Sequence, residues 1–262
     1  MIGNNIIELS ETGSTNDFLE ALSQGQNLED GTVVFALHQK EGKGLGTNRW
    51  ISEAGQNLTC SFLLKPVFLH AMDQFFLNIM MSLSVCDLVR EMLSGLIEPE
   101  RIRIKWPNDI YIDDKKVSGI LIRNTISGEY SDQSILGVGI NLNQVEFPPD
   151  LPNPVSLKSH TGTTCDIAKT MDLLCRHLEI RYRQLMDGKK QVLLNDYLEC
   201  LFRKGIWCKY SAGRQVFDGR IHGVSSSGQL MVETSSGQML EFGFREIRML
   251  IESQEAEGQS WL

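Results

Sequence analysis

Residues 101–121 read RIRIKWPNDIYIDDKKVSGIL, and this stretch decides how we interpret the fold. Its start alternates cationic and apolar side chains, which predicts a strand with Arg101, Arg103 and Lys105 on one face. A Trp-Pro pair then fixes the chain direction. The segments DIYI and KKVSGILIRN follow as two further strands, with DDKK as the turn between them. The alternating cations are equally typical of a solvated strand face, so the pattern alone leaves their role open.

A second cationic segment follows the predicted strand TVVFALHQ at 32–39 and reads GKGLGTNRW at 42–50. Glycines let backbone N–H groups approach an anion closely, and nearby cations can complete such a site. A mobile surface loop would have the same composition. Neither common phosphate motif fits, because Gly44 follows Lys43 and Thr47 stands where the dinucleotide fingerprint needs glycine.

The rest of the chain predicts an α+β (mixed α/β) fold with a central mixed β-sheet flanked by helices. Further strands are expected at IIEL, NLTCSFLLKP and SILGVGINLN, and helices at 14–25, 73–94, 166–187 and 190–202. From Gly205 onward the sequence pattern predicts short strands joined by glycine turns, which is typical of a small β-barrel. We therefore expect a catalytic domain at 1–203, a β-barrel domain at 204–253 and a polar tail at 254–262.

Bulk composition excludes several classes of protein. The 262 residues are 42% apolar, and a net charge of −8 argues against general nucleic-acid binding, although a local basic cleft is compatible with it. Six cysteines without a CxxC pair argue against a zinc site or a disulfide framework. The start shows no signal peptide, and polar residues interrupt the apolar stretch FFLNIMMSLSVCDLV. We expect a cytoplasmic protein without a membrane span.

Five segments together resemble the biotin protein ligases. They are STND (14–17), HQKEGKGLGTNRW (38–50), GQNL (55–58), KWPNDIYIDDKKVSGIL (105–121) and GVGINLN (137–143). Their order and spacing match that family from about residue 5 to the C-terminus, and the Lys-Trp-Pro-Asn motif is the most specific of them. The resemblance implies the biotin/lipoate ligase-type catalytic domain followed by a small SH3-like β-barrel. It also implies the monofunctional form, without the winged-helix DNA-binding domain of the repressor ligases.

The activity implied by the resemblance has two steps. Biotin and MgATP form biotinyl-5′-AMP and pyrophosphate, and a lysine of a biotin carboxyl carrier protein, the acceptor domain of a biotin-dependent carboxylase, then attacks the mixed anhydride. The cofactors would be ATP and Mg²⁺, with biotin as substrate. No DNA or membrane partner is expected, and related ligases allow a homodimer. Two anions at 4 Å repel by about 4 kcal/mol at an effective dielectric near 20, which explains why the motifs contain cations rather than a nucleophile.

The resemblance also implies the site residues. Lys105 and Lys43 would be the catalytic cations. Biotin would contact the following residues: Ser14, Thr15, Asn16, Gln39, Gly42, Lys43, Gly44, Trp50 and Lys105. The nucleotide would contact the following: Lys43, Gly44, Leu45, Asn48, Trp50, Lys105, Asn108 and Asn141. The metal ligands are not predicted. Ser14 and Thr15 can also be read as a plain helix cap, and Trp50 as a core tryptophan.

The chain departs from the family pattern at two positions. Leu45 stands where many members have arginine, in the loop that closes over the adenylate, which raises the question of how the intermediate is retained. Arg123 stands where many have glutamate, and a local surface pair would explain it. Two alternative functions are a lipoate protein ligase of the same fold, which needs an apolar slot for its substrate, and a non-catalytic biotin-binding regulatory protein.

Overall fold

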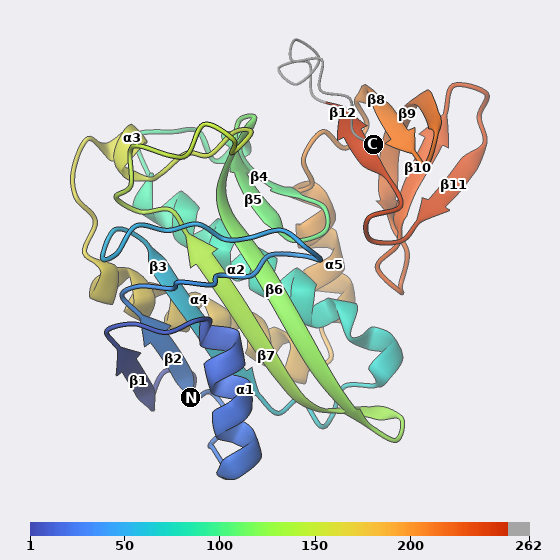
Figure 1. Ribbon diagram of the computed structural model, residues 1–262. Helices are drawn as coiled ribbons and strands as arrows, with labels where there is room; N and C mark the ends of the chain where they lie inside the picture. The colour runs from blue at the N-terminus through green and yellow to red at the C-terminus, as the bar shows by residue number, and fades with distance from the viewer. Residues whose placement is uncertain (251–262) are drawn as a thin grey trace. The chain divides into compact units, whose positions relative to one another are not determined.

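The computed structural model describes residues 1–250 and divides into two units, Met1–Cys200 and a second that begins at Leu201. We call them unit 1 and unit 2. The predicted polar tail at 254–262 and the last residues of the predicted barrel domain lie outside the described residues. Each unit has its own sheet (Figure 1).

Unit 1 is built on a seven-stranded sheet in the order β1-β2-β3-β7-β6-β5-β4. The first pair is parallel and all other pairs are antiparallel, so the predicted mixed sheet is confirmed. The strands are β1 (Ile6–Leu9), β2 (Val33–Ala36), β3 (Leu58–Leu64), β4 (Ile102–Lys105), β5 (Asp109–Ile112), β6 (Lys115–Ser127) and β7 (Tyr130–Ile140).

Helices cover both faces of this sheet. Figure 1 shows α1 (Thr15–Gly25) in front of the sheet and α2 (Phe75–Met92) and α4 (Ile167–Met186) behind it. This double cover explains why every residue of β2 and β3 is buried. The segment Ala71–Met92 is long and apolar enough to cross a membrane, but 72% of its apolar window is buried inside the structure, as in the core helix of a soluble protein. The other helical segments of unit 1 are η1 (Ala71–Asp73), η2 (Pro99–Arg101), α3 (Lys158–Thr161) and α5 (Lys190–Glu199).

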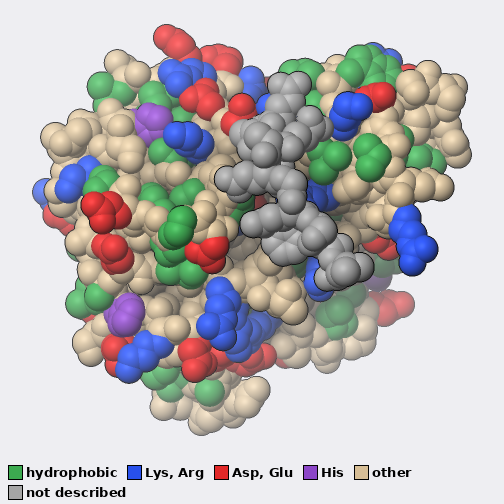
Figure 2. Space-filling view, turned by 45° about the horizontal axis from the view of Figure 1, so that its top comes forward, with side chains coloured by type: hydrophobic (Ala, Val, Ile, Leu, Met, Phe, Trp, Pro, Cys, Tyr) green, Lys and Arg blue, Asp and Glu red, His purple; other side chains and the backbone are tan. Residues whose placement is uncertain are grey.

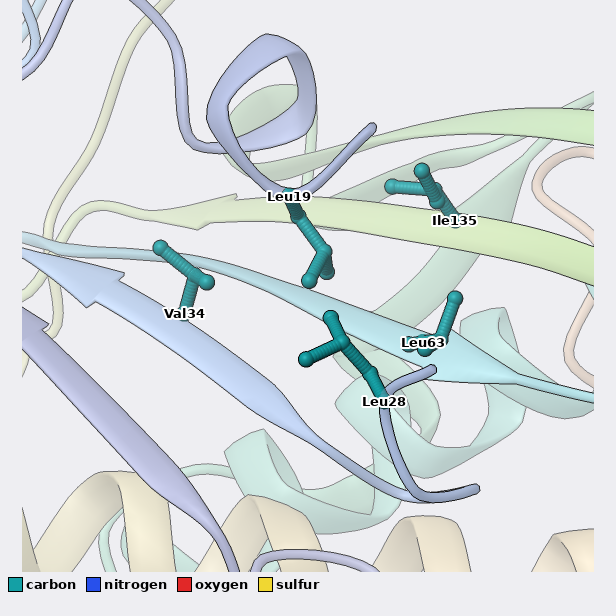
Figure 3. Close-up of a cluster of buried hydrophobic side chains, with 5 residues drawn as sticks. All are labelled: Leu19, Leu28, Val34, Leu63 and Ile135. Carbon is teal, nitrogen blue, oxygen red and sulfur yellow. The ribbon is translucent and has the colours of Figure 1, made fainter. Parts of the chain in front are cut away.

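A compact apolar cluster joins α1 to the sheet. Figure 3 shows the side chains that meet there, from α1, the following loop and three neighbouring strands: Leu19, Leu28, Val34, Leu63 and Ile135. All of them are at most 9% exposed. Burying one such side chain stabilises a fold by roughly 1.5–3 kcal/mol, so this cluster fixes where α1 begins and hence where its N-terminal residues lie.

Beyond this cluster, the side chains on the same face of the sheet are small or polar. On β7, Ile135, Gly137 and Gly139 share one face because alternate residues of a strand point the same way. Their partners on β3 follow the same trend: Leu63, Ser61 and Thr59. The apolar end anchors α1, and the glycine end leaves room above the sheet.

Unit 2 is a five-stranded antiparallel sheet in the order β11-β10-β9-β8-β12. Its strands are β8 (Trp207–Ala212), β9 (Gln215–Val224), β10 (Leu230–Thr234), β11 (Met239–Phe242) and β12 (Arg248–Leu250). Phe217 stacks between Tyr210 and Phe242, with 6.0 Å between ring centroids on each side. The predicted β module is confirmed, while its closure into an SH3-like barrel stays a prediction.

Several sequence-based expectations need adjustment. The hairpin of β6 and β7 extends through the segment TISGEYSD, which turns at Gly128 with φ +62°, whereas only the two outer parts were predicted as strands. α3 and β12 were not predicted. Ser14 occupies the N-cap position of α1, but its side chain makes no capping hydrogen bond.

Candidate functional site

A cavity of about 180 Å³ lies above the glycine end of the sheet in unit 1. It lies where the start of α1, the glycine-rich segment and β5 to β7 come together. Its lining residues are Ser14, Thr15, Asn16, Gln39, Lys43, Gly44, Leu45, Asn48, Arg49, Trp50, Pro107, Asn108, Asp109, Lys116, Gly119, Ile120, Leu121, Gly137, Val138 and Gly139. Segments far apart in the sequence, including both cationic stretches, therefore line one cavity.

Two glycines of β7 make the approach of two larger side chains feasible. A Cβ atom at Gly137 would lie 2.7 Å from Asn16 Cγ, and one at Gly139 would lie 2.6 Å from Trp50 Cζ2. Real Cβ atoms do not approach other atoms so closely. The GVG sequence therefore lets Asn16 and Trp50 pack directly onto the sheet backbone.

A polar network fixes the start of α1 beside the cavity. The Gln39 Oε1 atom accepts hydrogen bonds from the Thr15 backbone N–H at 2.7 Å and from the Thr15 hydroxyl at 3.0 Å. Behind it, Ser61 Oγ lies 2.7 Å from Thr15 Oγ and 2.5 Å from Asn16 Oδ1. Asn16 in turn donates to the Leu121 carbonyl at 3.1 Å. Because each member is bonded, the network is a rigid wall.

Two donors on this wall remain for a ligand. Within residues 1–250, neither Ser14 Oγ nor Gln39 Nε2 has a hydrogen-bond partner. Both residues line the cavity. A ligand with a polar ring, offering carbonyl oxygens and N–H groups, would therefore find partners here.

The glycine-rich segment forms a tight hairpin. Its backbone pairs at both ends, with Trp50 N–H donating to Gly42 O at 2.9 Å and Gly44 N–H donating to Asn48 O at 2.8 Å. A side chain at Gly42 would overlap the Trp50 backbone. Gly46, at the tip, has φ +70°, which glycine adopts without strain. Leu45 thus lies at the tip of the hairpin, and the cationic residues Lys43 and Arg49 lie on its two arms.

A β-bulge brings Lys116 to the cavity. Asp109 pairs with Gly119 across β5 and β6, but after a register shift Tyr111 pairs with Lys116, leaving Val117 without a partner on β5. A bulge redirects the side chains that follow it, so Lys116 shares the cavity face with Asp109. The Lys116 ammonium lies 2.7 Å from Asp109 Oδ1. It also lies 6.0 Å from the centroid of the Trp50 ring.

The Trp-Pro-Asn turn is anchored by two helices of unit 1. The Pro107 carbonyl accepts hydrogen bonds from Asn78 Nδ2 of α2 at 2.7 Å and from the Tyr197 hydroxyl of α5 at 3.0 Å. The side-chain amide of Asn108 donates a hydrogen bond to the Ile120 carbonyl, and the Ile120 backbone N–H donates one to the Asn108 carbonyl. These bonds hold the turn against β6 at the cavity wall.

The cavity lining is cationic although the protein is acidic. Its charged members are Lys43, Arg49, Lys116 and Asp109, a net charge of +2 from three cations and one carboxylate. The whole chain carries −8. On the face that Figure 2 shows, Lys and Arg side chains are interspersed with Asp and Glu side chains. A cationic pocket within such a surface attracts small anions selectively.

Lys43 is bound to a charge network outside the lining. Its ammonium lies 2.6 Å from Asp17 Oδ2, and Arg123 Nη1 lies 2.8 Å from Asp17 Oδ1 and 2.6 Å from Glu20 Oε2. Partial burial acts to raise the pKa of Asp17, but the hydrogen bonds from Lys43 and Arg123 outweigh it and hold this pKa below its usual value. Asp17 is therefore ionised near neutral pH.

Most residues predicted for the site line the cavity. Those that do not are Gly42, Lys105 and Asn141. Lys105 lies on the edge strand β4 opposite Asp109, and its ammonium is 3.1 Å from the Tyr111 hydroxyl. Asn141 is buried and donates to the Val155 carbonyl at 3.1 Å. The ligand contacts predicted for these three residues stay predictions.

Sequence reasoning missed four features of the cavity and of the polar network behind it. Arg49 and Lys116 are cations of the quoted motifs that were not named as site residues, and Asp109 is the only carboxylate of the lining. Alternation along the strand could not reveal Lys116, because a bulge breaks it. The fourth feature is Ser61, for which a signal existed, since it is a polar residue in the otherwise apolar run CSFLL.

No preformed metal centre is seen in the part of the chain that the structure describes, where no three His, Cys, Asp or Glu residues cluster suitably. Mg²⁺ usually binds one or two carboxylates together with substrate phosphates. Asp109, on the cavity wall, fits that donor set.

Several known proteins are similar to this chain. Residues 10–141 match the model of the biotin/lipoate A/B protein ligase family. The chain is 28% identical over 238 residues to a biotin–[acetyl-CoA-carboxylase] ligase of Paracoccus denitrificans, covering 88% of this chain and 95% of that one. It is 30% identical over 190 residues to the ligase of that name from Mycobacterium tuberculosis, covering 72% and 68%. Among solved structures, the biotin protein ligase of Aquifex aeolicus in complex with biotin and ATP is similar, with a TM-score of 0.77, 27% identity and coverage of 94% and 99%.

Proposed function

Since the chain belongs to the biotin/lipoate A/B protein ligase family, we propose that it is an ATP-dependent biotin protein ligase whose active site is the cavity of unit 1. It activates biotin to biotinyl-5′-AMP with release of pyrophosphate. It then transfers biotin to a lysine of a biotin carboxyl carrier protein. The observation that carries the site is the meeting of the Thr15–Gln39 network with three cations in one cavity.

The polar wall recognises the ring of biotin. A ureido ring offers one carbonyl oxygen and two N–H groups, so it needs donors and acceptors together. Ser14 Oγ and Gln39 Nε2 supply donors, and Thr15 and Asn16 hold them in place through the network. Trp50, packed on Gly139, covers the apolar part of the ligand.

The cations serve the first chemical step. The biotin carboxylate oxygen attacks the α-phosphorus of ATP, the bond to the β-phosphate oxygen breaks, and pyrophosphate leaves with that electron pair. No general base is needed, because the carboxylate is already ionised near neutral pH. Lys43, Arg49 and Lys116 reduce the repulsion between the two anions and stabilise the charge of the transition state.

Mg²⁺ would be held by Asp109 together with phosphate oxygens of ATP, where it would further neutralise phosphate charge. In the second step the carrier lysine, as the free amine, attacks the anhydride carbonyl carbon and AMP leaves. Asn108 and the hairpin tip at Leu45 and Asn48 are proposed to contact the nucleotide. The acceptor is proposed to be the carrier domain of a biotin-dependent carboxylase in the cytoplasm.

A pyrophosphate-exchange assay tests this function. Labelled pyrophosphate should enter ATP when biotin is present, and not when lipoate replaces it. Exchange with lipoate alone would assign the chain to lipoate ligation. Exchange with neither compound, in protein that binds biotin, would identify a non-catalytic biotin-binding protein.

A further inference from the structure

We propose that Asp17 and Arg123 position Lys43 for the anionic ligand: Asp17 is the resting partner of the Lys43 ammonium, and Arg123 keeps Asp17 neutralised when Lys43 turns to the ligand. The inference deepens the proposed function and rests on it, because it concerns how a cation of the same cavity becomes available.

The three residues and Glu20 form one balanced cluster. Asp17 is bonded on both carboxylate oxygens, by Lys43 at 2.6 Å and by Arg123 at 2.8 Å. Arg123 also bonds Glu20 at 2.6 Å. Asp17 and Glu20 are three residues apart on α1 and therefore share a face. Two carboxylates face two cations, so the cluster is neutral as long as Lys43 remains in it.

Lys43 can leave this cluster for the cavity. Lys43 is a residue of the cavity lining, whereas its present partner Asp17 is not. The side chains of Lys43 and Asp17 are 47% and 39% exposed, and ion pairs with this much solvent contact are weak and readily exchanged. The backbone of Lys43 is paired with Arg49 in the hairpin, so rotation of the side chain is the expected movement.

Arg123 sets how firmly Asp17 holds Lys43. With Arg123 present, Asp17 and Glu20 keep a cation between them after Lys43 has turned away. Without it, Lys43 would be the only cation of the cluster facing two carboxylates, and the ligand would have to compete against both. Burial acts to lower the pKa of Arg123, but its bonds to Asp17 and Glu20 raise this pKa, in agreement with a permanent charge at this point.

The test is a mutant cycle read out by ligand affinity. Arg123→Met should weaken biotin binding, measured by calorimetry, by about twofold to fivefold, the range expected for an exposed ion pair. Asp17→Asn should tighten binding slightly, and the double variant Asp17→Asn/Arg123→Met should lose the defect of Arg123→Met. KM values for biotin and for ATP, from pyrophosphate exchange, show whether the carboxylate or the phosphate is the anion that Lys43 meets.

The Lys43→Met background is the control that separates positioning from folding. There, Arg123→Met and Asp17→Asn should leave biotin affinity unchanged, because the residue through which they act is gone. The defect of Arg123→Met should also shrink with added salt, which screens exposed charges. Equal shifts with and without Lys43 would overturn the proposal and assign both residues a purely structural role.

A further measurement does not depend on the reaction. In the absence of ligands, Asp17→Asn should speed proteolysis at residues 41–49, because Lys43 then loses its resting partner. Unchanged cleavage would overturn the proposed resting contact. If wild-type protein shows no biotin-dependent exchange while this cleavage difference is present, the proposed function fails and the contact between Asp17 and Lys43 stands.

Discussion

Lys116 and Asp109 lie on neighbouring strands and form an ion pair of 2.7 Å on the cavity wall, although strict alternation would direct Lys116 to the other face of the sheet. Gly119 makes room for this pair, since a Cβ atom there would lie 3.1 Å from the Lys116 ammonium. On β4, the edge strand on the other side of β5, Lys105 is the backbone register partner of Asp109. Of these two lysines, Lys116 is therefore the one that lines the cavity.

This placement predicts different effects for the two lysines. Lys116→Met should lower the rate of adenylation by on the order of 10²-fold or more, because a cation that stabilises the transition state is lost. Lys105→Met should have a smaller effect, since its ammonium bonds the buried Tyr111 hydroxyl. Pyrophosphate exchange measures both. The reverse order would return the main catalytic role to Lys105, as the sequence motif suggested.

The fold could largely be predicted from the sequence because its signals are local. Helical spacing predicted 73–94 where α2 spans Phe75–Met92, and 166–187 where α4 spans Ile167–Met186. The resemblance to the biotin protein ligases predicted that the glycine-rich segment and the Trp-Pro-Asn turn belong to one site, and both line the cavity. Periodicity, caps and turns act within a few residues of each other, and this is why they can be read along the chain.

The features that could not be predicted depend on pairing between strands. A one-residue bulge at Val117 decides which lysine faces the cavity, and nothing in the sequence KKVSGIL distinguishes it from a regular strand. The pairing of Arg123 with Asp17 and Glu20 likewise requires β6 to lie beside α1. Arg123 lies about a hundred positions from both carboxylates, so no local pattern along the chain links them.

Substitution of the β7 glycines should displace the cavity residues that pack on them. Gly139→Ala would force Trp50 off the sheet, and Gly137→Ala would displace Asn16. Overpacking of this kind costs about 1–3 kcal/mol of stability, and ligand affinity should fall as well. Thermal unfolding and biotin calorimetry measure the two effects. Gly25→Ala is the matched control, because nothing lies within 4 Å of a Cβ atom there, and it should lower neither stability nor affinity.

The glycine-rich hairpin should become more resistant to proteolysis when ligands bind. Short backbone pairings at its two ends and the ion pair between Lys43 and Asp17 hold it, and its tip at residues 45–48 contains exposed side chains. Contacts with an adenylate would offset the entropy of ordering this tip. Cleavage at residues 41–49 should therefore slow when biotin and ATP are added together. Equal rates with and without ligands would indicate a static hairpin.

Removal of unit 2 should impair turnover more than biotin binding. The cavity residues all belong to unit 1, so a soluble fragment of residues 1–203 should still bind biotin. We expect its exchange and carrier biotinylation to fall, because the resemblance to the biotin protein ligases implies that unit 2 contributes to engaging ATP or the carrier. Calorimetry and a carrier-labelling assay measure the two properties. Normal labelling by the folded fragment would show that unit 2 is dispensable.

Leu45 should retain the adenylate by burial. A mixed anhydride reacts with any amine, so selective labelling requires that it stay bound until the carrier lysine arrives. Leu45 lines the cavity and is half-buried at the hairpin tip. An arginine there would hold the ligand by charge-assisted hydrogen bonds, each contributing about 1.5–3 kcal/mol, and full burial of a leucine side chain contributes a similar amount.

We therefore expect Leu45→Gly to release biotinyl-5′-AMP about tenfold to a hundredfold faster than the native enzyme, in line with the loss of such a contact. The released intermediate should label bystander proteins, which the native enzyme should not do. Leu45→Arg is the matched comparison, since it restores a long side chain with a different mode of contact, and it should retain the adenylate. Off-rates of the adenylate from the three forms decide the matter: if the native and glycine forms release it equally fast, Leu45 plays no part in retention.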